Sequence, residues 1–98
     1  MALKFADEPC GVHHNPVYVV ITAQDSETNE HIECRISYNV FVRRYRSKSI
    51  ADDKLLSVFE TNRAEILAVT QEKYETGSVE RTPNGIILVL NVEDFGPI

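Results

Sequence analysis

The 98-residue sequence has no tryptophan, one methionine, two cysteines, four glycines and four prolines. Two cysteines are too few for the disulfide framework of a small secreted domain, so we expect free thiols and a cytoplasmic location. The longest unbroken apolar run, Ile86 to Leu90, is far too short to cross a membrane. The first nine residues include Asp7 and Glu8 and lack an apolar segment, unlike a secretory signal. We therefore expect neither membrane association nor export.

The chain does have the composition of a folded protein, with 43% hydrophobic and 26% charged residues. Its length supports one hydrophobic core, not two. We expect a single domain over residues 1–98, in which residues 1–15 are largely irregular.

Alternating apolar and polar residues predict strands in the first half of the chain. In residues 17–23 apolar side chains occupy both alternating faces, which is typical of a strand that is covered on both sides or lies at a subunit contact. In residues 31–36 the apolar positions Ile32, Cys34 and Ile36 share one face, and polar residues share the other. The second strand is therefore expected to be half-exposed.

Helical periodicity follows in the middle of the chain. Tyr38, Phe41, Val42 and Tyr45 fall on one apolar stripe and predict a first helix whose stripe faces the domain. The expected elements are a short edge strand at 3–5, a loop at 10–15, strands at 17–23 and 31–36 joined by a hairpin loop at 25–30, helices at 38–47 and 50–76, a turn at 83–85 and a strand at 85–92.

The order (β)ββααβ predicts a two-layer α+β domain. We expect a mostly antiparallel sheet of three to four strands, covered on one face by two helices. The last strand is expected to be central or to pair with the first long strand. Two helices cannot cover both faces of such a sheet, so the apolar residues of its second face, Tyr18 and Val20 among them, predict a homodimer.

The net charge of −5 hides a basic segment between residues 35 and 48, which carries a charge of +5 and no acidic residue. The remainder of the chain sums to −10 and would repel a phosphate backbone. Three interpretations remain open: a solvated helix balanced by acidic neighbours, a binding site for an acidic protein partner, and a weak nucleic-acid site. The candidate partner-binding residues are Arg43, Arg44, Arg46 and Lys48.

Arg63 lies close to the centre of the apolar stripe of the long predicted helix. A charge at such a position must reach solvent or find a partner. We interpret it as a structural ion pair with Glu33, Asp94 or Glu60, and the alternative is an anion site.

The remaining candidates for chemistry are weak. Cys10 and His13 with His31 and Cys34 mimic a four-ligand zinc spacing, but residues three apart on a strand point to opposite faces. A loosely bound metal at His13 and His14 stays open. Cys34 reads as a core residue, and no phosphate-binding loop or nucleophile motif is present in the sequence. We therefore expect no catalytic residues, no metal and no cofactor.

Several short motifs resemble one known family. They are the stretch Ile32-x-Cys34-x-Ile36-Ser37, the stretch Phe59-x-x-x-Arg63-x-x-Ile66 followed by Ala68, and a last apolar strand that ends at Asp94-Phe95. Over residues 16–95 the chain resembles the small bacterial proteins catalogued as domain of unknown function 1488. The resemblance implies a strand-rich start, a helical middle and a C-terminal strand, and it implies no activity.

The functional hypothesis from the sequence is a non-enzymatic protein-interaction or regulatory module. The alternative is a nucleic-acid-associated regulator that uses the basic segment 35–48.

Overall fold

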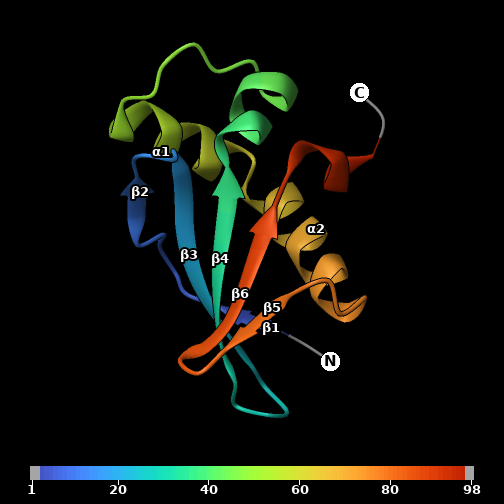
Figure 1. Cartoon of the computed structure of the whole chain (residues 1–98). Helices are drawn as coiled ribbons and strands as arrows, with labels where there is room; N and C mark the ends of the chain where they lie inside the picture. Colours follow the sequence, from blue (N-terminus) through green and yellow to red (C-terminus); the bar gives the residue numbers. More distant parts are fainter. Residues whose placement is uncertain (1–2, 97–98) are drawn as a thin grey trace.

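The computed structural model describes residues 3–96 as one mixed sheet with helices on one side (Figure 1). The strands are β1 (Leu3–Phe5), β2 (Gly11–His13), β3 (Tyr18–Asp25), β4 (His31–Ser37), β5 (Glu80–Thr82) and β6 (Gly85–Leu90). The helices are the π-helical turn η1 (Val40–Arg44), α1 (Asp52–Thr61), α2 (Arg63–Glu75) and the 3₁₀ turn η2 (Val92–Phe95).

The sheet has the strand order β1-β3-β4-β6-β5, and β2 also pairs with β3. β4 and β6 are parallel, and every other pair is antiparallel. The α+β class and the mostly antiparallel sheet are thus confirmed. The predicted number of strands was wrong, because the sheet has six.

The two unpredicted strands, β2 and β5, are each only three residues long. β2 lies in the segment 10–15 that was expected to be a loop, and β5 precedes the predicted turn at residues 83–85. Three residues carry too little alternation to signal a strand, so only pairing with a long neighbour defines them. The expected edge strand at residues 3–5 is confirmed as β1.

The last strand is interior to the sheet, as expected, but its partner differs. β6 pairs with β4 in parallel and does not pair with the first long strand. The helices connect β4 to the β5–β6 hairpin, and a parallel pair requires a long crossover of this kind.

The core lies between the helices and one face of the sheet. Alternate strand residues such as Ile21, Cys34 and Leu88 are buried there, against Phe59 of α1 and Ile66 of α2. The opposite face has no helix over it in Figure 1.

The helical middle also differs from the prediction. The expected helix at 38–47 is reduced to η1, and the expected helix at 50–76 is two helices separated at Asn62. The Asn62 side-chain amide donates to the carbonyl of Val58 (2.9 Å), and its backbone leaves helical geometry at φ −113°. The break divides the predicted long helix into α1 and α2. In the described part of the chain, no helix is long and apolar enough to span a bilayer.

Candidate functional site

The uncovered face of the sheet is here called the open face. On it, apolar and charged side chains of adjacent strands lie next to one another. Val20 of β3 lies beside Arg35 of β4, which lies beside Val89 of β6. Val89 is 39% exposed, although β6 is an interior strand that lies between β4 and β5. The open face is therefore a partly apolar surface over which the described residues place no second layer.

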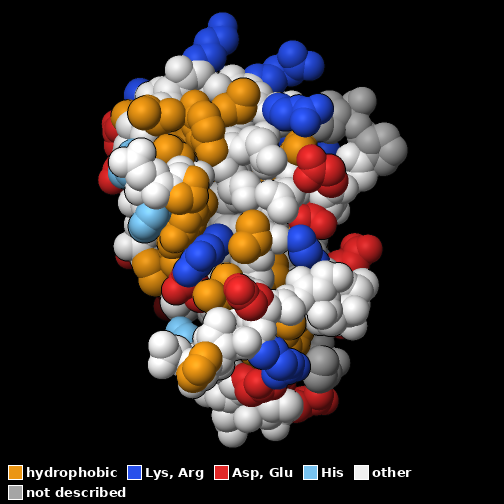
Figure 2. Space-filling view, viewed as in Figure 1, with side chains coloured by type: hydrophobic (Ala, Val, Ile, Leu, Met, Phe, Trp, Pro, Cys, Tyr) orange, Lys and Arg blue, Asp and Glu red, His pale blue; other side chains and the backbone are white. Residues whose placement is uncertain are grey.

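One end of the open face is hollowed. The hollow has a volume of about 460 Å³ and lies where the parallel strands β4 and β6 end and β3 begins. It is lined by Pro16, Val17, Tyr18, Arg35, Ser37, Tyr38, Asn39, Val89 and Asn91. Figure 2 shows hydrophobic side chains gathered on this part of the surface. Its size is suitable for one or two large side chains or a small molecule.

An aromatic and charged cluster borders the hollow. The His13 ring stacks on Tyr18 with centroids 4.6 Å apart, and the Arg35 guanidinium lies 5.1 Å from the centroid of the Tyr18 ring. Arg35 also pairs with Glu33, its neighbour on the same face, and this hydrogen bond raises the pKa of Arg35. The cluster holds no activated nucleophile, and its opposite charges neutralise each other.

The strand pattern predicted that Tyr18 and Arg35 point to the same face, but it did not predict this cluster. His13 reaches Tyr18 only because β2 pairs with β3, and that pairing has no signal in the sequence.

The structure separates the four basic candidates into two kinds. Arg44 donates through Nε and Nη2 to both carboxylate oxygens of Glu65, at 3.0 and 2.7 Å, and lies over the ring of Phe95. The hydrogen bond from Arg44, and to a smaller extent that from the hydroxyl of Tyr45, lowers the pKa of Glu65 to about 2. Arg44 therefore ties η1 to α2.

The other three basic candidates, Arg43, Arg46 and Lys48, are exposed. The predicted apolar stripe of this segment was wrong at one position, because Val42 is 38% exposed and Val40 is buried in its place. The π-helical turn changes the angle between successive side chains, which the ordinary helical period does not anticipate.

Arg63 is the first residue of α2, because the long helix is divided just before it. Its Nη2 donates to the carbonyl of Ala6 (2.7 Å), and its Nη1 lies 3.5 Å from the carboxylate of Glu60. The guanidinium also lies over the ring of Phe59, at 5.7 Å. Of the three predicted partners only Glu60 is beside Arg63.

The other two predicted partners of Arg63 form ion pairs with different residues. Glu33 pairs with Arg35, and Asp94 pairs with Lys73 at 2.8 Å. Arg63 thus connects the N-terminal segment to the start of α2.

The cysteine and histidine candidates do not converge. Cys34 is fully buried, and burial raises the pKa of its thiol to about 12, with a smaller contribution from Glu33. His31 of β4 lies beside Gln24 at one end of β3, and His13 of β2 lies beside Tyr18 at the other end. His14 pairs with Asp52 (2.7 Å). Within residues 3–96, no three potential metal ligands lie close enough together to hold an ion.

The fold and this surface define a small α+β domain with one bare sheet face. A family model described as protein of unknown function (DUF1488) matches residues 3–88, and the chain belongs to this family. The match confirms the resemblance that the sequence motifs indicated. Comparisons with curated proteins and with solved structures give no match.

Proposed function

We propose that this protein is a non-enzymatic interaction module of the cytoplasm that forms a homodimer through the open face of its sheet. The observation that supports the proposal is the bare face itself, with its exposed Val89 and its apolar hollow beside Tyr18. An apolar surface of this kind on a small protein commonly marks a contact with another chain.

The local pattern of charges on the open face, unlike the net charge of the chain, favours a second copy as the occupant. The chain carries a net charge of −5, so two copies repel each other over most of their surface. At the centre of the open face, however, Arg35 and Glu33 lie side by side. A two-fold axis through this pair would place the Arg35 of one copy near the Glu33 of the other, and no like charges would meet there.

Light scattering coupled to size-exclusion chromatography tests the dimer. We expect wild type at micromolar concentration to scatter at twice the chain mass of 11.1 kDa. Val89→Glu places a charge on the open face and should give the monomer mass with an unchanged circular dichroism spectrum, because Val89 already faces solvent in the single chain.

Val42→Glu is the matched control, because Val42 is as exposed as Val89 (38% against 39%) but lies on η1, outside the open face. It should remain a dimer. A monomeric wild type at high micromolar concentration, or equal behaviour of the two variants, would contradict the proposal.

The alternative, a nucleic-acid-associated regulator, has less support. Arg35 and Arg44, two of the five basic residues of segment 35–48, are each paired with an acid. Three free cations on an acidic chain predict only weak and strongly salt-dependent binding to a phosphate backbone.

A further inference from the structure

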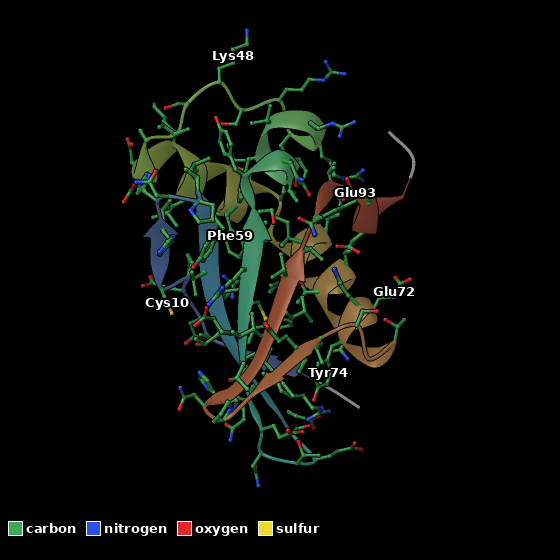
Figure 3. All side chains as sticks on the ribbon, viewed as in Figure 1. Cys10, Lys48, Phe59, Glu72, Tyr74 and Glu93 are labelled. Carbon is green, nitrogen blue, oxygen red and sulfur yellow. The ribbon has the colours of Figure 1, made fainter. Side chains whose placement is uncertain are left out.

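A second surface, separate from the open face, consists of the end of η1 and the loop that follows it before α1. Residues 42–50, here called the basic loop, lie at the end of the molecule opposite the β5–β6 turn (Figure 1). Lys and Arg side chains project from this end in Figure 2, and Lys48 marks its tip in Figure 3. Across the described residues 3–96, Arg43, Arg46 and Lys48 find no hydrogen-bond or ion-pair partner. The three charges are therefore free for another molecule.

The backbone of the basic loop is held in place. The amide of Ser47 donates to the carbonyl of Phe41 (2.7 Å), the hydroxyl of Ser47 donates to the carbonyl of Ser49 (3.2 Å), and the hydroxyl of Ser49 accepts from the amide of Ala51 (3.1 Å). Arg46 has a left-handed backbone with φ of +57°, which a non-glycine residue adopts only at a cost. The fold thus maintains an unfavourable conformation in the middle of the loop.

The basic loop also exposes aliphatic side chains. Val42 is 38% exposed and Ile50 is 52% exposed. Among the described residues only three large hydrophobic side chains are exposed, and these are two of them; the third, Val89, belongs to the open face. Free cations and bare aliphatic groups are therefore combined in nine residues of the chain.

We propose that the basic loop docks an acidic segment of a different protein, in which carboxylates alternate with aliphatic side chains. Charge complementarity determines the class of partner, because Arg43, Arg46 and Lys48 offer three separate donors to carboxylates. Val42 and Ile50 supply the apolar contacts, which a purely ionic surface pair would lack.

Two other anionic partners fit the basic loop less well. Electrostatic attachment to an anionic membrane typically uses a cluster of four to eight basic residues, and the loop has three free ones. Extended nucleic acid would bring its phosphates near an acidic remainder of the chain, whereas a short peptide contacts the loop alone.

Fluorescence anisotropy with the full-length chain tests the proposal. The probe is a labelled synthetic peptide of alternating aspartate, glutamate and leucine residues, in about 150 mM salt. We expect saturable binding. The triple variant Arg43→Glu, Arg46→Glu, Lys48→Glu should bind at least about tenfold more weakly, and Val42→Ser with Ile50→Ser about tenfold more weakly.

Single substitutions provide a matched pair. Arg46→Gln should weaken binding about threefold, whereas Arg81→Gln, which removes an exposed arginine from β5, should leave it unchanged. Glutamine is as disfavoured as arginine in the left-handed conformation, so the effect at residue 46 reports charge. All variants of the basic loop should keep the dimer mass of wild type, because none of these residues lies on the open face.

Three results would overturn the proposal. The first is the absence of peptide binding up to about 1 mM protein. The second is that the triple variant binds the peptide as tightly as wild type does. The third is that wild type binds vesicles of phosphatidylserine or duplex DNA more tightly than it binds the peptide at the same salt concentration.

Discussion

Asp25 is a carboxylate with no exposed surface at the end of β3. One oxygen accepts from the amides of Glu27 (2.8 Å) and Thr28 (3.2 Å), and the other accepts from the hydroxyl of Tyr74 (2.6 Å). These donors, Tyr74 first, lower the pKa of Asp25, while burial acts in the opposite direction. The buried charge therefore holds the β3–β4 loop to the end of α2.

This pair predicts a dependence of stability on acid. Because the pKa of Asp25 in the folded chain lies below its ordinary value, the unfolded chain binds the proton more readily. The stabilisation is complete above the unfolded pKa and is lost as the pH falls through the folded pKa. Tyr74→Phe removes the strongest donor, so its unfolding free energy should fall less between about pH 5 and pH 2 than that of wild type.

Thermal unfolding provides the measurement. At neutral pH Tyr74→Phe should melt at least about 4 °C below wild type. Tyr38→Phe is the control, because in the described residues the Tyr38 hydroxyl has no hydrogen-bond partner and the substitution keeps the ring that lines the hollow. It should melt like wild type, with the full acid dependence. Identical acid profiles for the two variants would refute this account of Asp25.

At the scale of elements, the β5–β6 hairpin depends on a close approach of two backbones. Gly85 begins β6 with φ of +136°, and a Cβ atom at this position would lie 2.9 Å from the carbonyl oxygen of His31. That carbonyl belongs to β4, so the contact lies where β6 starts to pair with β4 in parallel. Only glycine meets both requirements without distortion.

Gly85→Ala should therefore lower the free energy of unfolding by about 1–3 kcal/mol, because it adds both backbone strain and a clash with an unyielding carbonyl. Gly77→Ala is the comparison, since Gly77 also has a positive φ (+79°) but a Cβ there would touch nothing. Urea titrations should give the larger loss for Gly85→Ala. Equal losses would mean that the carbonyl contact carries no energy.

At the scale of the whole molecule, the helices of the described residues cover one face of the sheet and leave the other uncovered. If the homodimer forms through that face, folding and association are linked, and the melting temperature must rise with protein concentration. We expect this rise for wild type and its absence for Val89→Glu, measured by calorimetry over about a hundredfold range of concentration. A wild-type melting temperature independent of concentration would exclude a dimer that dissociates on unfolding.

Much of this fold was readable from the sequence, because its signals are local. Alternation located β3 and β4 and assigned Ile32, Cys34 and Ile36 to the core, where all three are buried. The same alternation placed Tyr18 on the opposite face. A strand with an apolar residue at every second position has a single apolar face, and that face must be the buried one in any fold.

The remaining features depend on neighbours that are distant in the sequence. β2 forms because it pairs with β3, and β6 pairs with β4 although two helices and β5 separate them along the chain. The helix break at Asn62 is likewise not marked by the helical period. The division of the basic residues also depends on such a contact, since Glu65 on α2 engages Arg44 and leaves Arg43 free. Charge type is a property of the residue, but whether that charge is available to a partner depends on which acid the fold brings within reach.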